Sequence, residues 1–204
     1  MKKSLITKAL ELRDAGFTAA DIAEELNISV DTALYLVLNG EKLLNEPENS
    51  NVESIRRDIF VEWDGIKTSS KRLKYLAMIM CDLLKNNDFD AVVGISTGGV
   101  PLATLISDIL DKEFYIYTPK KHLQSKTDKS TGVIGQSKIP KNKKIVIVDD
   151  VMTSGNTMKE AVGYLKTIGE PIKAMVIIDK KGIDCIEGTE IISLFKVGIV
   201  EINK

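Results

Sequence analysis

Residues 145–157 read Ile-Val-Ile-Val-Asp-Asp-Val-Met-Thr-Ser-Gly-Asn-Thr. Four consecutive apolar residues predict a central strand buried on both faces, with two acids at its carboxyl end. Small and hydroxyl-bearing residues then form a short loop that opens a helix. In open α/β sheets, ligands bind outside the carboxyl ends of strands, and a helix amino terminus attracts phosphate. The stretch therefore predicts an α/β sheet with an anion-binding loop.

The two halves of this stretch suit two parts of one ligand. Hydroxyl donors for a phosphate are present at Thr153, Ser154 and Thr157. Gly155 lets the backbone approach the anion closely. The two acids are unsuited to phosphate, but they accept hydrogen bonds from ribose hydroxyls. A sugar phosphate satisfies both halves at once.

From residue 55 onward, apolar runs alternate with helical patterns, which predicts a doubly wound α/β fold. Strands are expected at 59–63, 91–95, 114–117, 144–149, 172–179 and 191–195, and the tail 198–202 is a candidate edge strand. Helices are expected from a cap at Ser69 or Ser70, from the turn after residue 95 to about Leu110, and at 157–168.

Residues 145–157 resemble the phosphoribosyl pyrophosphate (PRPP)-binding motif of type I phosphoribosyltransferases. The resemblance implies that Asp149 and Asp150 hold the ribose hydroxyls. It also implies a 5′-phosphate loop made of Thr153, Ser154, Gly155, Asn156 and Thr157. Mg²⁺ would arrive with PRPP, and no metal is expected to be held by the protein alone. The alternative is an unused turn, which leaves two adjacent acids without a partner.

A second glycine-rich turn follows the strand expected at 91–95. Its residues are Ser96, Thr97, Gly98 and Gly99. The turn resembles the pyrophosphate loop of the same family, in which backbone N–H groups face the diphosphate and a non-proline peptide is often strained. Glycine turns are common, so a plain turn is the alternative.

The polar connection 118–141 is long enough to predict a functional loop, and it is rich in lysine with one acid. Orotate phosphoribosyltransferases have a lid here that carries a catalytic lysine. The match is loose, because Pro119 replaces an arginine and Leu123 falls near the expected lysine. Substitute lid residues are Lys120, Lys121 and Lys126. His122 is expected to be a solvated loop residue.

Residues 1–44 predict a separate helical domain, followed by a linker at 45–54 and the α/β domain at 55–204. Helices are expected near 4–15, 19–26 and 29–38, with Thr18 and Ser29 as caps and Asn39-Gly40 as the final stop.

The helical domain resembles a helix-turn-helix, whose second paired helix enters the major groove. Its candidate DNA-reading residues are Ser29, Val30, Asp31, Thr32 and Tyr35, and Leu34 is also expected to be exposed. Residues 29–38 contain no Arg or Lys, and residues 1–44 have five basic and seven acidic residues, a net charge of −2. Since DNA affinity comes largely from neutralising phosphates, a helical module for dimer contacts is the alternative.

The two-part architecture resembles archaeal transcriptional regulators of sugar-degradation genes. It implies a homodimeric, DNA-binding regulator that senses PRPP or another phosphorylated metabolite. The rival hypothesis is an active orotate-type phosphoribosyltransferase that transfers phosphoribosyl from Mg-PRPP to a nucleobase; an interaction module is the third.

The composition of the chain bears on its partners and on its location in the cell. The net charge of −1 provides no global attraction to nucleic acid or membrane. No apolar run approaches the roughly 20 residues of a membrane span, so a cytoplasmic protein is expected. Cys81 and Cys185 are expected to be reduced, packed thiols.

Overall fold

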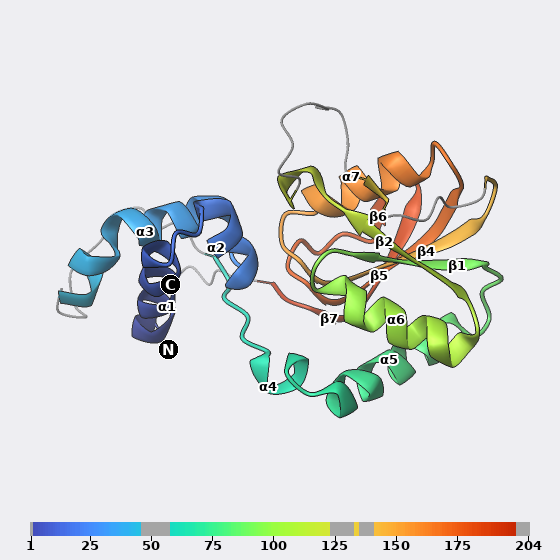
Figure 1. Cartoon of the computed structure of the whole chain (residues 1–204), viewed down its shortest axis with the longest axis horizontal. Helices are drawn as coiled ribbons and strands as arrows, with labels where there is room; N and C mark the ends of the chain where they lie inside the picture. Colours follow the sequence, from blue (N-terminus) through green and yellow to red (C-terminus); the bar gives the residue numbers. More distant parts are fainter. Residues whose placement is uncertain (1, 46–57, 123–132, 135–140, 199–204) are drawn as a thin grey trace, which may run out of the picture. The chain divides into compact units, whose positions relative to one another are not determined.

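The computed structural model describes residues 2–45, 58–122, 133–134 and 141–198 (Figure 1). The chain divides into two compact units, Met1–Trp63 and Asp64–Lys204. The second unit therefore begins later than the predicted start at residue 55. The predicted linker 45–54 lies, apart from Asn45, outside the described residues.

The first unit contains the three predicted helices, α1 (Lys2–Asp14), α2 (Ala19–Glu25) and α3 (Val30–Asn45). Thr18 caps α2 in a capping box with Asp21, as its sequence indicates. The apolar faces of the helices enclose one core, made of Ile6, Ala9, Leu10, Ile22, Ala23, Leu26, Ile28, Ala33 and Leu36.

Helix α3 continues past the predicted stop at Asn39-Gly40, so that prediction is wrong. Gly40 is buried, and a Cβ atom there would lie 2.9 Å from Cδ2 of Leu10. The glycine therefore lets α1 and α3 approach each other and does not end the helix. The Asn39 side chain forms a hydrogen bond within the helix, in which its Nδ2 donates to the carbonyl oxygen of Tyr35 (3.0 Å).

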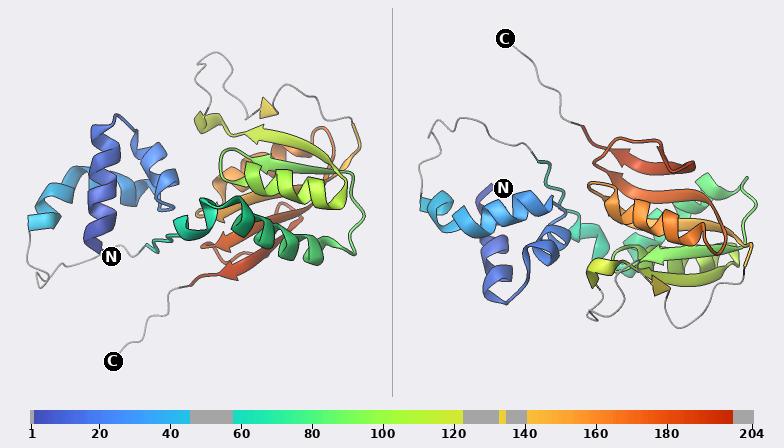
Figure 2. Two further views of the ribbon diagram at one scale, coloured as in Figure 1. Left: turned by 60° about the horizontal axis from the view of Figure 1, so that its bottom comes forward. Right: turned by 90° about the horizontal axis from the view of Figure 1, so that it is seen from above.

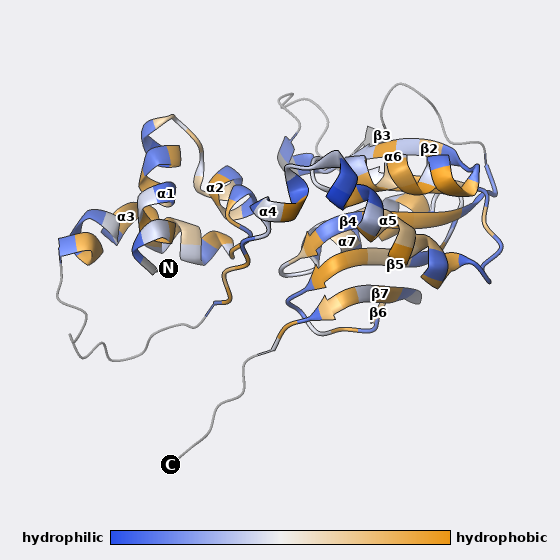
Figure 3. Cartoon of the chain, turned by 90° about the horizontal axis from the view of Figure 1, so that it is seen from below, coloured by the Kyte–Doolittle hydropathy of each residue, from blue (hydrophilic) through white to orange (hydrophobic). Residues whose placement is uncertain are grey.

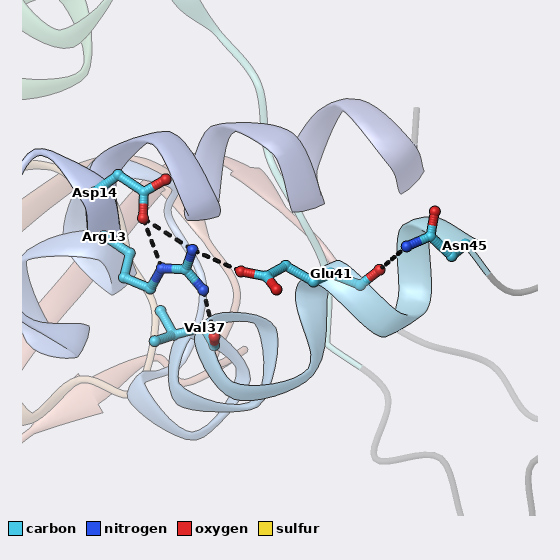
Figure 4. A network of polar contacts seen from close by, with 5 residues as sticks. All are labelled: Arg13, Asp14, Val37, Glu41 and Asn45. Atoms are coloured by element: carbon cyan, nitrogen blue, oxygen red, sulfur yellow. Dashed lines mark hydrogen bonds and ion pairs between the residues drawn. The ribbon is translucent and has the colours of Figure 1, made fainter.

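Arg13 joins α1 to α3 (Figure 4). Its guanidinium donates to Oδ1 of Asp14 and Oε1 of Glu41, each at 2.9 Å, and to the carbonyl oxygen of Val37 at 3.4 Å. One of the few basic groups of this unit is thus used within the unit itself.

The strand predicted at residues 59–63 is wrong, because this segment is irregular. Its contacts are with the helices: Phe60 packs against their core, and Glu62 lies 3.7 Å from Nζ of Lys8. Oδ2 of Asp58 accepts the N–H of Ser29 at 2.7 Å. The apolar residues of the segment therefore reflect packing on helices, and the described residues of this unit include no strand that could pair with it.

The second unit is built on one sheet with the strand order β3-β2-β1-β4-β5-β7-β6 (Figure 1). The strands are β1 (Ala91–Ile95), β2 (Glu113–Thr118), β3 (Val133–Ile134), β4 (Lys144–Met152), β5 (Glu170–Asp179), β6 (Cys185–Ile186) and β7 (Thr189–Lys196). Pairing is parallel from β2 to β7, and the short strands β3 and β6 are antiparallel at the two edges.

Helices cover both faces of the sheet, which confirms the predicted doubly wound fold. They are α5 (Ser70–Leu84), α6 (Gly99–Leu110) and α7 (Asn156–Leu165), and the short helix α4 (Asp64–Lys67) precedes and contacts α5. Helices α5 and α6 lie on one face and α7 on the other (Figure 2). Ser69 caps α5 by accepting the N–H of Arg72 at 3.4 Å. The ribbon of β5 is mostly hydrophobic, as expected of a strand covered on both faces (Figure 3).

Several element ends differ from the prediction. Strand β4 runs three residues beyond Asp149, and α7 ends before the predicted residue 168. The candidate edge strand 198–202 lies, apart from Gly198, outside the described residues. Cys81 is buried, which raises the pKa of its thiol to about 11, but Cys185 is exposed on the edge strand β6 and is not a packed thiol.

Candidate ligand-binding site

The sheet reverses its winding direction between β1 and β4. The connection β1–α6–β2 steps one way across the sheet, and β4–α7–β5 steps the other way. Right-handed crossovers then place α6 and α7 on opposite faces, and the loops after β1 and β4 diverge. Open α/β sheets bind ligands at such a switch point, at the carboxyl ends of the strands.

Asp149 and Asp150 lie just beyond the point where β4 stops pairing with β1. Pairing of β1 with β4 ends at Gly94 and Val148, while β4 continues alongside β5 to Met152. Each carboxylate is fixed by the next N–H group: Asp150 donates to Oδ1 of Asp149 at 2.9 Å, and Val151 donates to Oδ1 of Asp150 at 2.8 Å. The two acids therefore occupy the opening at the switch point.

The glycine-rich turn after β1 lies directly against these acids. A Cβ atom on Gly98 would lie 2.3 Å from Cγ of Asp150. A Cβ atom on Gly99 would lie 2.2 Å from the carbonyl oxygen of Val148 and 2.9 Å from Cα of Asp149. At Gly99 the close atoms belong to the backbone of β4, so only glycine fits there, and at Gly98 the close atoms are those of the Asp150 carboxylate. The two loops singled out in the sequence therefore meet at one place.

The start of this turn is held by β2. The N–H of Ser96 donates to the carbonyl oxygen of Tyr117 at 2.9 Å, and the hydroxyls of Ser96 and Thr118 lie 3.3 Å apart. The peptide bond between Ser96 and Thr97 is cis. Thr97 is exposed, so the middle of the turn is open to solvent.

The candidate phosphate loop leads from β4 into α7. Gly155 is the N-cap of α7 and has φ 80°, a left-handed conformation that favours glycine. Thr153 precedes the cap with exposed Ser154, and Asn156 and Thr157 begin the helix.

Glycine caps both helices that start at this site. Gly98 caps α6 and Gly155 caps α7, so neither cap residue has a side-chain oxygen, and at α7 the Ser154 hydroxyl accepts only the N–H of Asn156, at 3.4 Å. Thr18 and Ser69, which cap α2 and α5, do provide such an oxygen. The first turns of α6 and α7 are thus suited to an anionic ligand.

Electrostatics single out Asp150. Burial raises the pKa of this carboxyl above its usual value; hydrogen bonds with the N–H of Val151 and with Asp149 lower it in part, and the charge of Lys67 does so more weakly. Lys67 also lies 3.1 Å from Oδ1 of Asp64 within α4. The sequence reasoning missed Lys67; its only signal is a position just before the Ser69 cap.

The structure describes only some of the candidate lid residues. Lys120 begins a short 3₁₀ helix, Lys120–His122, after β2, and its N–H donates to Oε1 of Glu160 in α7 at 3.0 Å. The Lys120 side chain is exposed. The Lys121 side chain and all of Lys126 lie outside what the structure describes.

The candidate DNA-reading residues lie at the start of α3, and they divide into two groups. Ser29 and Thr32 serve the helix cap: the Ser29 hydroxyl accepts the N–H of Thr32 at 3.1 Å and lies 2.8 Å from its hydroxyl. Val30, Asp31 and Tyr35 are exposed. Leu34 is exposed as well, so this face of α3 is largely apolar.

Comparison with known proteins places the chain in a family. The phosphoribosyl transferase domain family matches residues 62–183. A transcriptional regulator GfcR from Methanococcus vannielii is 59% identical over 206 residues and covers all of both chains. A second GfcR, from Methanocaldococcus jannaschii, is 48% identical and covers 100% of this chain and 98% of its own.

Solved structures agree on the fold of the second unit. The crystal structure of orotate phosphoribosyltransferase from Aeropyrum pernix superposes with a TM-score of 0.55 and 20% identity, covering 69% of this chain and 81% of that chain. None of the helices described here is long and apolar enough to cross a membrane. The chain belongs to the GfcR family of transcriptional regulators, and its second unit is a type I phosphoribosyltransferase-like domain.

Proposed function

We propose that this protein is a DNA-binding transcriptional regulator whose second unit senses PRPP or a related sugar phosphate. The observation that supports the ligand is the meeting of two loops at the switch point, where Gly98 touches Asp150. Carboxylates for ribose hydroxyls lie there beside two glycine-capped helix starts suited to phosphates. A ligand with a ribose between two phosphate groups matches this order of groups.

Mg²⁺ fits this proposal as a companion of PRPP. Hard cations prefer carboxylate and phosphate oxygens, and the acids of β4 supply carboxylates beside the proposed diphosphate position. When bound, the ion supplies positive charge that offsets the diphosphate. The residues of the chain orient the sugar: Asp149 and Asp150 accept its hydroxyls, and the loop Thr153–Thr157 receives the 5′-phosphate.

The first unit is proposed to bind promoter DNA as a helix-turn-helix in the cytoplasm. Two helices joined by a tight turn and an exposed face on α3 support this role. The unit is acidic, so we propose a homodimer, in which two heads contact two half-sites about 34 Å apart and their phosphate contacts add.

A short path along the chain connects the ligand site with α3. Lys67 acts electrostatically on Asp150, and it ends the helix that begins immediately after Trp63. The segment before Trp63 is attached to the helices of the first unit, since Asp58 accepts the N–H of Ser29 at the start of α3. Ligand binding at Asp150 is thus proposed to change how the heads are presented to DNA.

A gel shift with promoter fragments tests this function. We expect DNA binding whose affinity changes at least fivefold when Mg-PRPP is added, in line with typical coupling free energies of roughly 1–3 kcal/mol. Inorganic phosphate is the matched control. Absence of DNA binding with and without PRPP would remove the proposal.

Transferase activity is the second candidate, because the proposed PRPP site is complete. Pyrophosphate release from Mg-PRPP with orotate or a purine base measures it directly. We expect little turnover, since no lysine stands at the lid position that carries catalysis in orotate phosphoribosyltransferases. Robust turnover that disappears in Asp150→Ala would reverse the ranking.

A further inference from the structure

Asp179, the last residue of β5, is a buried acid that the proposed ligand site does not use. The residue is fully buried. Its Oδ1 accepts the N–H groups of Lys181 and Gly182, each at 2.8 Å, whereas Oδ2 is buried and has no hydrogen-bond partner among the described residues. Burying a carboxyl group is unfavourable unless hydrogen bonds compensate for the lost water. What the acid contributes at this position is therefore the pair of hydrogen bonds on Oδ1.

These hydrogen bonds set the course of segment 180–186, which follows β5. Two successive N–H groups converge on one oxygen atom, and Gly182 adopts a left-handed backbone with φ 70°. Just before them, the N–H of Lys180 donates to the carbonyl oxygen of Met152, the last residue of β4, at 2.9 Å. The segment thus starts fixed to the ends of β4 and β5, next to the loop Thr153–Thr157.

Segment 180–186 lies against the candidate phosphate loop. A Cβ atom built on Gly155 would lie 3.6 Å from Cδ1 of Ile186 and 3.8 Å from Cδ1 of Ile183. Ile186 belongs to the core that includes Met158 of α7, and Ile183 packs against that core. Strand β6 and helix α7 lie side by side (Figure 1). The segment therefore supports the phosphate loop at its glycine.

Other contacts hold this part of the chain to α7 less firmly. The carbonyl oxygen of Glu187 accepts Nζ of Lys166, and Oε1 of Glu187 lies 4.0 Å from Nζ of Lys159. Both lysines are exposed, and exposed charged pairs contribute little to stability. Water cannot readily replace a buried acceptor, so losing the bonds to Asp179 costs more. The bonds to Asp179 therefore decide where the segment lies.

We propose that Asp179 is a positioning residue for the subsite that receives the 5′-phosphate. Its Oδ1 fixes the start of segment 180–186, the two isoleucines of that segment contact Gly155, and the loop keeps the first N–H groups of α7 directed at the phosphate. Asp179 itself touches no ligand atom. This role rests on the proposed function, since it assumes that the loop Thr153–Thr157 binds a phosphate.

Isothermal titration of the full-length protein with ribose 5-phosphate and with Mg-pyrophosphate tests this role. Asp179→Ala frees two buried N–H groups, so we expect its affinity for ribose 5-phosphate to fall roughly tenfold or more, as small displacements of positioned groups allow. Its affinity for Mg-pyrophosphate should stay within about twofold of wild type, because the proposed diphosphate position lies at the turn of Gly98 and Gly99. A purely structural role would lower both affinities or neither.

Two variants serve as controls. Asp179→Asn keeps an oxygen that can accept both N–H groups, so it should bind ribose 5-phosphate within about threefold of wild type. In Asp90→Ala, the lost carboxylate is one that accepts the N–H of Lys144 at 2.9 Å, at the opposite, amino end of β4. This variant removes the same kind of bond away from the phosphate loop, and it should leave both affinities within about twofold of wild type.

A milder variant covers the case in which Asp179→Ala does not fold, which circular dichroism would show. Ile183→Ala removes a half-buried side chain that lies beside Gly155. It should lower the affinity for ribose 5-phosphate roughly threefold or more and leave that for Mg-pyrophosphate unchanged. Where Asp179→Ala does fold, the amides of residues 153–157 should exchange hydrogen roughly tenfold faster than in wild type.

The outcomes separate this role from the proposed function. Folded Asp179→Ala that binds ribose 5-phosphate within about twofold of wild type, or that loses affinity for the two ligands equally, would overturn the role of Asp179 and leave the regulator intact. Unchanged binding of ribose 5-phosphate by Ile183→Ala would overturn it as well. A wild-type chain that binds neither ligand would overturn both the role of Asp179 and the proposed sensing of a sugar phosphate.

Discussion

The buried carboxyl of Asp150 costs stability at neutral pH. Its carboxylate is held among buried groups, and burial raises its pKa. In the unfolded chain an aspartate titrates near about 4, so above that pH the unfolded state gives up this proton more readily than the folded state. The penalty is absent below the unfolded pKa and grows as the pH rises toward the folded pKa.

Asp150→Asn should therefore stabilise the protein at pH 7, by on the order of 1 kcal/mol. The amide oxygen can still accept the N–H of Val151. The gain should shrink as the pH falls toward about 4, because both states of the wild type are then protonated. Denaturant unfolding at pH 4 and pH 7 measures it, with exposed Asp108→Asn as the control. A variant less stable than wild type at pH 7 contradicts this reading.

Gly99→Ala should damage the switch point. The new Cβ would lie 2.2 Å from the carbonyl oxygen of Val148, and a backbone oxygen of a central strand cannot move aside cheaply. We expect a loss of about 1–3 kcal/mol in the free energy of unfolding.

Gly65→Ala is the control for this variant, since its Cβ would meet nothing within 4 Å. It should be neutral or slightly stabilising. Equal effects of the two substitutions would show that the close approach of the loops is wrong.

At the residue scale, the sequence pointed to the acids and the glycine turns because their chemistry is local. It missed Lys67, because its relation to Asp150 depends on how α4 folds back toward β4. It also misjudged Gly40, since a glycine that ends a helix and one that lets two helices approach look alike until the neighbouring helix is placed.

The capping box of α2 is an element-scale feature with a measurable contribution. Thr18 Oγ1 accepts the N–H of Asp21, and the Asp21 carboxylate accepts the N–H of Thr18 at 3.0 Å. Thr18→Ala should cost about 1 kcal/mol. Hydrogen exchange of the full-length chain should then show α2 amides exchanging roughly fivefold faster.

Thr7→Ala is the matched control. Its hydroxyl donates to the carbonyl oxygen of Lys3 inside α1, where alanine is the better helix former. Its helix should exchange no faster than in wild type. Unchanged α2 exchange in Thr18→Ala would mean that the capping box does not hold this helix.

Buried elements were the easiest to predict. The apolar runs of β1, β4 and β5 have one interpretation when helices cover both faces. The segment at 59–63 shows the limit of this approach, because a short apolar run can equally pack on helices. Strand β4 extends past its acids because β5 remains beside it after β1 ends, which no local pattern reveals.

At the scale of the whole molecule, the proposed regulation depends on communication through the segment between the units. Insertion of three glycines between Trp63 and Asp64 should leave DNA binding and PRPP binding each within about twofold of wild type. The effect of PRPP on DNA affinity should be lost, since a flexible insert breaks the path from Lys67 to Asp58. Retained coupling would show that another route connects the two functions.

The two-part organisation was predicted from the change from short helices to alternating strands and helices along the chain, and the structure has two compact units. The identity of the effector could not be predicted from the sequence, because PRPP and other sugar phosphates present the same groups to the same loops.

Isothermal titration of Mg-PRPP into the full-length protein, beside Asp150→Asn, tests the central claim most directly. We expect one saturable site per chain in the wild type, and at least a tenfold weaker one in the variant, because the amide replaces the carboxylate proposed to accept ribose hydroxyls. No saturable heat with PRPP or ribose 5-phosphate, or equal affinity in the two proteins, would contradict it.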